Sequence, residues 1–222
     1  MDRVVLTRTA ASDAVSGLGW RFALGALRTT VRVASLVQAV AVADVVTTPS
    51  STDHLWLDLR PDRVLLTVQA WDLGGVTAAE VALARRLSAD VAALGLATEP
   101  GEPRTVQALE IAVDALDIAA VRPFWKAVLG YADEPGAGPS GALVDPFRQG
   151  PSVWFQQMDA PRPQRNRIHV DVSVPHDEAG RRIAAALAAG GRLVSNAAAP
   201  SFWVLADVEG NEVCVTTWQG RD

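Results

Sequence analysis

The alternation of apolar and polar positions in the N-terminal half predicts four β-strands. Apolar residues recur at every second position in Trp20–Leu24 and Leu27–Val33, as in a half-buried hairpin. The same alternation returns in Leu55–Leu59 and Val64–Ala70. The segment Arg60–Arg63 between them has proline at its second position, which favours a β-turn. These residues therefore predict two hairpins.

Helical spacing of apolar residues predicts three helices around these strands. A short helix spans about Thr9–Ser16, and a longer one spans Ala34–Val46. The residues expected on the buried side of the longer helix are Leu36, Val37, Val40 and Ala43. Thr77 and Glu80 form a capping box that opens a third helix, which runs to Leu94. The predicted order of elements is αββαββα.

The segment Ala97–Pro103 interrupts both kinds of pattern. It holds two prolines, a glycine and two acidic residues, a composition that continues neither a helix nor a central strand. It follows a predicted helix and precedes a predicted strand, as a linker between domains does. The sequence thus predicts an N-terminal domain at residues 1–97 and a C-terminal domain at residues 104–222.

The C-terminal half contains the same order of elements twice. A strand, a helix ended by glycine and further strands are followed by a second set of the same kind. The first set comprises Val106–Val113, Asp117–Leu129, Leu143–Val144 and Ser152–Gln156. The second set comprises Ile168–Val174, Glu178–Ala189 (capped by Asp177), Arg192–Val194, Phe202–Leu205 and Glu212–Trp218. The predicted fold class is therefore α+β, with an internal duplication in the second domain.

Composition and charge exclude several classes of function. The 222 residues are 49% hydrophobic, which is enough apolar material for two buried cores. The formal net charge of −5, without a basic run, argues against a nucleic-acid or membrane partner. The single cysteine, Cys214, excludes an internal disulfide framework and fits a reducing compartment. Because no signal-peptide pattern and no bilayer-spanning apolar stretch are present, we expect a cytoplasmic protein.

Three segments of the C-terminal half are similar to those of a known superfamily. They are Asp117 with Phe124–Trp125 and Leu129–Tyr131, then Asn166–Asp171, then Ala206–Cys214. In this order and spacing they resemble the vicinal oxygen chelate superfamily, in its glyoxalase-like branch, whose relatives include bleomycin resistance proteins and extradiol dioxygenases. The resemblance covers nearly the whole C-terminal half. It implies paired βαβββ modules around a pocket for a small molecule.

The resemblance also implies a divalent metal ion (zinc, iron or manganese) that chelates adjacent oxygens of the substrate as a Lewis acid. By motif position its ligands would fall on Glu110, His169 and Cys214, where the family's last ligand is normally a glutamate. A fourth ligand would fall on or near Trp154, whose side chain is not a metal ligand. Three mixed ligands suffice only if they converge. We therefore expect Glu110 and His169 to line a pocket that holds little or no metal tightly.

These residues also have structural interpretations. A lone strand cysteine is most often a small buried apolar residue, and an inward histidine is often only hydrogen-bonded. Catalytic roles for Glu110 and His169 therefore depend on strand alternation turning both toward the pocket. Aromatic side chains would form the ligand-binding walls, although alternation lets only some of them face inward. The candidates are Trp125, Trp154, Phe155 and Trp203.

The N-terminal half carries a second resemblance. Gly19–Trp20 opens its first predicted strand, and Asp72 and Gly75–Thr77 precede its last predicted helix. Together with the αββαββα order, these residues make about Gly19–Leu96 similar to pterin-4a-carbinolamine dehydratase. That family removes water from a carbinolamine, which requires an acid and a base that work near neutral pH.

The catalytic histidines of that family are mostly replaced. Asp53–Leu55 stands in place of a His-His-Pro segment and keeps only His54, and Trp71 stands in place of another histidine. Tryptophan cannot transfer a proton. Glu80 stands near the family's acid, but its place in the capping box favours a role as a helix cap. We therefore predict a dehydratase-like domain without dehydratase activity, in which Trp56 and Trp71 either stack on a flat ring or belong to the core.

Three hypotheses for function stay open at this level. In the first, the C-terminal pocket performs metal-assisted lyase, isomerase or dioxygenase chemistry with Glu110 and His169 at the metal. In the second, the pocket sequesters a small molecule without chemistry, as resistance proteins of the superfamily do. In both, the N-terminal domain senses a ligand or dimerises the protein. In the third, His54 serves an active dehydratase with an appended domain.

Overall fold

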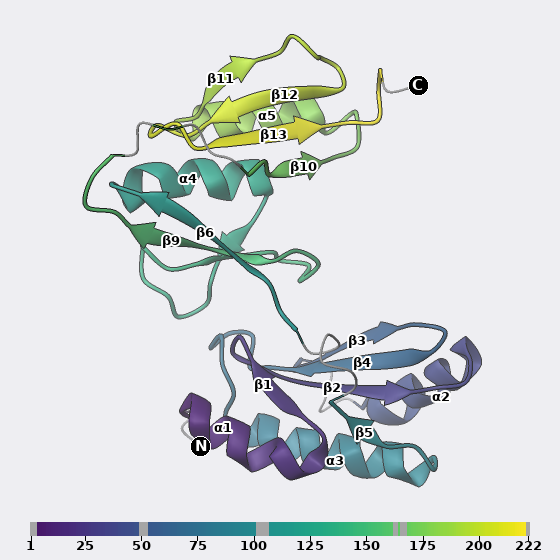
Figure 1. The fold of residues 1–222 in the computed structure, drawn as a ribbon. Helices are drawn as coiled ribbons and strands as arrows, with labels where there is room; N and C mark the ends of the chain where they lie inside the picture. Colours follow the sequence, from purple (N-terminus) through teal and green to yellow (C-terminus); the bar gives the residue numbers. More distant parts are fainter. Residues whose placement is uncertain (1–3, 49–52, 101–106, 162–163, 165–167, 221–222) are drawn as a thin grey trace. The chain divides into compact units, whose positions relative to one another are not determined.

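The computed structural model describes residues 4–48, 53–100, 107–161, 164 and 168–220 (Figure 1). The chain divides into two compact units, Met1–Ala108 and Leu109–Asp222. Each unit has its own cluster of buried hydrophobic residues. The predicted mixed α+β fold class is confirmed. Residues 101–103 of the predicted linker, and 166–167 of the predicted second motif, lie outside the described residues.

The N-terminal unit is an antiparallel sheet with helices packed against it. Its strands are β1 (Arg21–Ala23), β2 (Ala26–Arg32), β3 (Leu55–Leu59), β4 (Arg63–Val68) and β5 (Thr98–Glu99). Its helices are α1 (Arg8–Val15), the short 3-10 helix η1 (Ser16–Leu18), α2 (Leu36–Val46) and α3 (Ala78–Ala93). The strand order is β1-β2-β4-β3, and β5 pairs with β2. Both predicted hairpins are present, since β1 pairs with β2 and β3 with β4.

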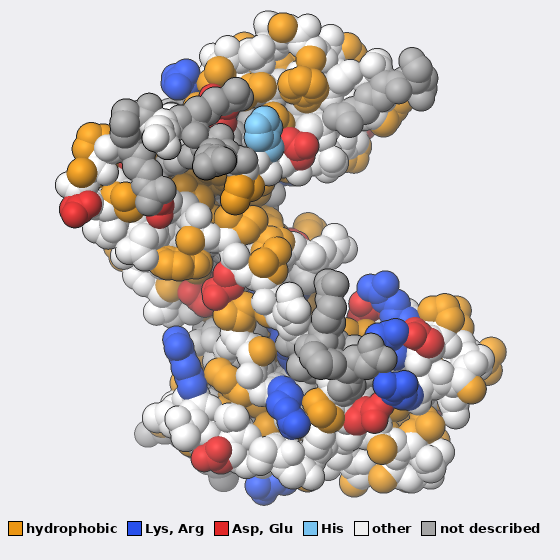
Figure 2. Space-filling model, in the orientation of Figure 1, with side chains coloured by type: hydrophobic (Ala, Val, Ile, Leu, Met, Phe, Trp, Pro, Cys, Tyr) orange, Lys and Arg blue, Asp and Glu red, His pale blue; other side chains and the backbone are white. Residues whose placement is uncertain are grey.

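The helix α2 forms where it was predicted, but it buries a different face. Its buried residues are Ala39, Val42 and Val46, whereas Leu36, Val37 and Val40 are exposed. All residues of α2 except Gln38 and Asp44 are apolar, so apolar spacing alone could not select the buried side. The prediction of the buried face was wrong. Figure 2 shows hydrophobic side chains at the surface of both units.

The predicted start of α3 is confirmed in detail. The backbone N–H of Thr77 donates to Oε2 of Glu80 at 2.7 Å, and the hydroxyl of Thr77 accepts from the backbone N–H of Ala79 at 3.2 Å. This capping box satisfies N–H groups that the first helical turn leaves without partners. The helix stops at Leu94, and Gly95 follows in the left-handed region at φ 72°.

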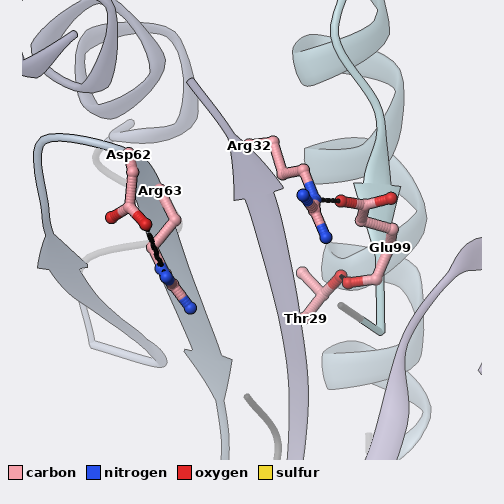
Figure 3. Close-up of polar contacts among 5 residues, drawn as sticks. All are labelled: Thr29, Arg32, Asp62, Arg63 and Glu99. Atoms are coloured by element: carbon pink, nitrogen blue, oxygen red, sulfur yellow. Dashed lines mark hydrogen bonds and ion pairs between the residues drawn. The ribbon is translucent and has the colours of Figure 1, made fainter. Parts of the chain in front are cut away.

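The start of the predicted linker belongs to the N-terminal sheet. Thr98 and Glu99 form β5, which pairs antiparallel with β2 (Figure 3). The guanidinium Nε of Arg32 donates to the Glu99 carboxylate at 2.7 Å, and the hydroxyl of Thr29 donates to the Glu99 carbonyl oxygen at 3.1 Å. Ala97–Pro103 was expected to continue neither a helix nor a central strand, and β5 is a strand of two residues that pairs with β2 outside the main strand order. Pro100 follows directly and has no N–H group to donate, so the pairing does not continue through it.

The C-terminal unit contains two four-stranded sheets and two helices. The first module comprises β6 (Glu110–Ala115), α4 (Ile118–Leu129), β7 (Ala132–Asp133), β8 (Leu143–Val144) and β9 (Ser152–Gln157). The second comprises β10 (Asp171–Ser173), α5 (Ala179–Ala188), β11 (Arg192–Ser195), β12 (Phe202–Ala206) and β13 (Glu212–Thr216). Asp117, predicted as the first residue of α4, is its N-cap, and its carboxylate accepts the backbone N–H of Ala120 at 3.1 Å. The predicted cap Asp177 was wrong, because Glu178 holds the N-cap position of α5 and makes no side-chain cap bond.

The two modules have the same topology. Their strand orders are β6-β9-β8-β7 and β10-β13-β12-β11, so each first strand lies beside the last strand of its module. Both of these pairs are parallel, and the other pairs are antiparallel. The helices α4 and α5 pack against each other, and the residues between them and the sheets form one core. This is the duplicated βαβββ arrangement that the sequence predicted.

Candidate functional site

Strand alternation gives each sheet of the C-terminal unit one face toward its helix and one face away from it. In β13, Val213 and Val215 belong to the core, so Cys214 points to the opposite face. Asp171 pairs with Cys214, and Ser173 pairs with Thr216, with their hydroxyl oxygens 2.8 Å apart. We call this outer surface the β10/β13 face. Asp171, Ser173, Cys214 and Thr216 belong to it by pairing, and alternation adds His169 and Glu212, which line a pocket together with Cys214.

His169 and Cys214 lie together on this face. The carbonyl oxygen of Val170 accepts a hydrogen bond from the backbone N–H of Cys214 at 2.9 Å, which keeps the chain before β10 alongside β13. A shallow pocket here has an enclosed volume of about 10 Å³, which is room for little more than one water molecule. Its lining residues are Ile168, His169, Val170, Glu212, Val213 and Cys214. Cys214 is buried, whereas His169 is exposed.

Glu110 lies on the other sheet. It is the first residue of β6, it is exposed, and it pairs with Ser152 of β9. Among the described strands, none of the first module pairs with one of the second. Glu110 is not among the residues that line the pocket beside His169 and Cys214.

The predicted metal ligands do not form a ligand group. Within the described residues, no three His, Cys, Asp or Glu side chains are placed to hold a metal ion together. The donor set that the structure presents therefore does not fit the divalent metal implied by the resemblance.

The tryptophan candidates differ in where they point. Trp154 is 38% exposed and lies on the outer face of β9, beside Ala112 of β6. Trp125 is only 3% exposed, and its indole N–H donates to the buried Oδ2 of Asp207 at 3.0 Å, so it is a core residue with little surface for a ligand. Trp203 is half-buried and packs against the core cluster, and Phe155 is a buried member of that cluster. Of the four aromatic candidates, Trp154 alone lies exposed on a sheet face turned away from the helices.

The N-terminal unit brings together residues that the sequence treated separately. Nδ1 of His54 lies 2.9 Å from Oε1 of Glu80, an ion-pair distance without hydrogen-bond alignment. The Glu80 side chain is 1% exposed and also accepts the Thr77 hydroxyl at 2.6 Å through Oε2. Trp56 follows His54 by two residues, and its ring lies 4.6 Å from the ring of Trp71, at a tilt of 39°. Glu80 is therefore both the predicted helix cap and a partner of His54.

Glu212 is a charged pocket residue that was not among the candidate site residues. Its signal was the same alternation that placed Cys214, because Glu212 precedes Cys214 by two residues and shares its face. Motif position drew attention only to the residue equivalent to the family's ligand. Pairing between β10 and β13 is what brings Glu212 next to His169.

The C-terminal unit is a small α+β domain built from two βαβββ modules, with polar residues on an outer sheet face. The model of the glyoxalase-like domain family matches residues 110–216, which is the span of both modules. These residues form a glyoxalase-like domain of the vicinal oxygen chelate superfamily, and the resemblance predicted for the C-terminal half is confirmed. The family match covers no residue before 110, so the dehydratase resemblance stays a prediction.

Several solved structures are similar to this chain over about half of its length. A glyoxalase/bleomycin resistance protein/dioxygenase family enzyme from Burkholderia phytofirmans PsJN is 18% identical, and the match covers 49% of this chain and 95% of that one with a TM-score of 0.40. A glyoxalase-related enzyme from Fulvimarina pelagi is 18% identical over 50% and 88% of the two chains, with a TM-score of 0.41. The fosfomycin resistance protein FosX from Listeria monocytogenes is 10% identical over 51% and 92%, with a TM-score of 0.40.

The sequence has no match among curated proteins. In the described part of the chain, no helix is both long enough and apolar enough to cross a membrane.

Proposed function

We propose that the protein binds a small molecule with adjacent oxygen atoms on the β10/β13 face of its C-terminal unit. The observation that supports this most directly is the pocket beside His169, Glu212 and Cys214. Small-molecule sites combine apolar walls with a few placed polar groups, and this pocket offers Ile168 and Val213 as its apolar part. The imidazole can donate and accept, the carboxylate accepts, and the thiol adds a weak donor.

The arrangement of the candidate side chains favours ligand binding without a metal ion. Glu110 lies on the other sheet, and the described residues present no group of three metal ligands. The pocket has room for about one water molecule. The ligand would therefore lie on an open surface rather than inside a closed cavity. A protein of this kind would sequester its ligand, as in the second hypothesis from the sequence. Glu110 and Trp154 form the corresponding outer face of the first module and are the further candidates for ligand contact.

The test is a thermal-shift comparison with catechol and a series of 2-oxo acids, each measured with a chelator and with added Mn²⁺. We expect at least one compound to raise the Tm of the native protein equally in both conditions, and His169→Ala to abolish the shift. His176→Ala is the matched control, because His176 is exposed in the same unit and contacts Trp218 instead. Elemental analysis should find well below one zinc, iron or manganese per chain. One tightly held metal that is lost in His169→Ala would overturn the metal-independent version.

A second candidate function is dehydratase chemistry in the N-terminal unit. The contact between His54 and Glu80 favours it, because a carboxylate beside an imidazole is a common acid–base arrangement. Trp71 argues against it, since this position would have to supply a further proton-transfer group. We therefore keep the prediction that this unit has no appreciable dehydratase turnover.

A further inference from the structure

The face of the N-terminal sheet that points away from the helices carries arginines on β2. The odd-numbered residues of β2 face the core, so Arg28, Thr30 and Arg32 lie on the opposite face. Each of these two arginines has a further arginine directly across from it on a neighbouring strand. Arg28 pairs with Arg21 of β1, and Arg32 pairs with Arg63 of β4. Like charges in directly opposed positions destabilise a sheet, so an anionic partner stabilises each pair.

Acidic side chains of the chain itself balance the pair formed by Arg32 and Arg63. Nε of Arg32 donates to the Glu99 carboxylate at 2.7 Å (Figure 3). Nε of Arg63 donates to the Asp62 carboxylate at 3.0 Å, in the same view. Because each of these two arginines has its own carboxylate, this end of the sheet face offers little positive charge to a ligand.

The pair formed by Arg21 and Arg28 is arranged differently. A guanidinium nitrogen of Arg21 donates to the carbonyl oxygen of Trp20 at 2.8 Å, and no carboxylate contacts Arg21 in the part of the chain that the structure describes. Arg21 is exposed, and Arg28 is half-buried. This end of the face therefore holds a guanidinium without an acidic partner directly across from a second one.

Two threonines beside Arg28 add hydroxyl groups to this end of the face. Thr67 of β4 is the partner of Arg28 on its other side, and Thr30 follows Arg28 by two residues on the same strand. Thr30 is 2% exposed, and its hydroxyl oxygen has no hydrogen-bond partner among the described residues. A buried hydroxyl without a partner costs free energy, so a ligand oxygen that accepts from Thr30 removes that cost.

We propose that Arg21, Arg28, Thr30 and Thr67 bind the phosphate group of a small phosphate monoester. We call these four residues the Arg21/Arg28 site. Near neutral pH a phosphate monoester carries a charge of about −1.5 to −2, which two guanidiniums match. Guanidinium groups donate to phosphate oxygens in pairs, and the two hydroxyls supply further donors. The site lies in the other unit from the β10/β13 face and uses neither His54 nor Glu80.

The neighbours of the site favour an ester over a free anion. Thr67 pairs on its far side with Trp56 of β3, and Leu65 shares the same face of β4. Both of these apolar side chains are half-buried, so they offer a surface for the organic part of the ester. A carboxylate carries only one charge and two oxygens. A nucleic acid requires a run of basic residues, and the sequence has none.

The first test is isothermal titration calorimetry of the full chain with phenyl phosphate, inorganic phosphate and acetate at low ionic strength. We expect one saturable site for phenyl phosphate, with weaker binding of inorganic phosphate and the weakest binding of acetate. Arg21→Gln and Arg28→Gln should each weaken the binding of phenyl phosphate about tenfold. Arg85→Gln is the matched control, because Arg85 is an exposed arginine of α3 in the same unit, and it should leave the affinity unchanged.

Three results of this titration would overturn the proposal. The first is the absence of saturable binding of phenyl phosphate by the native chain. The second is an affinity that Arg28→Gln leaves unchanged, or that Arg85→Gln lowers equally. The third is inorganic phosphate bound as tightly as phenyl phosphate, which would limit the site to the free ion.

The second test separates ligand binding from a structural role of the buried hydroxyl. Thr30→Val keeps the shape of the side chain and removes the unsatisfied hydroxyl, so it should raise the Tm of the ligand-free protein. It should also weaken the binding of phenyl phosphate severalfold, because one donor is lost. Thr29→Val is the matched control, since the Thr29 hydroxyl donates to the carbonyl oxygens of Gly19 and Glu99. It should lower the Tm and leave the affinity unchanged. A higher Tm in Thr30→Val with unchanged affinity would remove Thr30 from the site and contradict the proposal.

Discussion

At the scale of single residues, the structure gives several side chains more than one role. Glu80 was predicted as a helix cap, and it is one, but it also lies against His54 in a place closed to solvent. Cys214 occupies a ligand position by motif, yet it is a small buried residue beside the pocket. Trp125 was a candidate pocket wall and instead holds Asp207 in the core. Sequence motifs located these residues, but they did not identify the residues that each one contacts.

The His54 substitution separates a structural role from a catalytic one. We expect the native protein to show no appreciable turnover of a carbinolamine pterin, because Trp71 cannot transfer a proton. His54→Ala should instead lower the free energy of unfolding by about 1–3 kcal/mol, since it leaves the buried Glu80 with one partner fewer. Urea unfolding and a spectrophotometric dehydration assay measure the two effects. Turnover in the native protein that disappears in His54→Ala would refute this prediction.

At the scale of elements, the turn between β12 and β13 connects the two modules. Asp207 is fully buried, and its carboxylate accepts the backbone N–H groups of Glu209 and Asn211, the Asn211 amide and the Trp125 indole. The Glu209 carboxylate accepts the backbone N–H groups of Leu116 and Asp117 at 2.8 and 2.6 Å, at the start of α4. The segment that resembles the family's third motif therefore fixes the second module against the helix of the first.

Asp207→Asn tests that role. The amide would keep one acceptor oxygen and place an N–H₂ group against donors, so we expect a loss of about 1–3 kcal/mol in the free energy of unfolding. The fluorescence of Trp125 should report the same transition, because its indole loses a charged partner. A cost below that of an exposed ion pair would show that the turn does not hold the modules together.

The matched control is Asp133→Asn, at an exposed carboxylate. Hydrogen bonds from Lys126 and then Arg122 hold the pKa of Asp133 below its ordinary value. A lowered pKa stabilises the fold above the pKa of the unfolded chain, and this contribution is lost as the pH falls through the folded pKa. We expect the control to cost less than about 1 kcal/mol at neutral pH.

At the scale of the whole molecule, two units with separate cores make up the chain. The N-terminal core is built around β2 and β4 with the helices α1 to α3, and the C-terminal core around α4, α5 and both small sheets. No residue belongs to both clusters among those described. Because β5 pairs with β2, Thr98 and Glu99 belong to the sheet of the first unit, so the connection between the two sheets starts after Glu99.

Limited proteolysis tests this division. Trypsin should cleave first after Arg104, which lies between β5 and β6, and should release fragments 1–104 and 105–222. Each fragment should keep amide protection in its own strands, because each has its own core. Arg104→Gln should delay the first cleavage. Cleavage that starts inside β6 or α3 instead, or hydrogen exchange with a single cooperative unit, would contradict the division.

The sequence by itself determined which segments form helices and strands and where several of them start. Alternation, capping residues and terminal glycines act within about one turn or one hairpin, so the capping box of Thr77 and the repeated βαβββ order were both predictable. Only the tertiary structure decided which side of α2 is buried and that Thr98 and Glu99 join the sheet. It also decided that His169, Glu212 and Cys214 line one pocket, whose lining does not include Glu110. Each of these depends on packing or pairing between segments far apart in the chain. Local patterns limit those contacts and do not select among them.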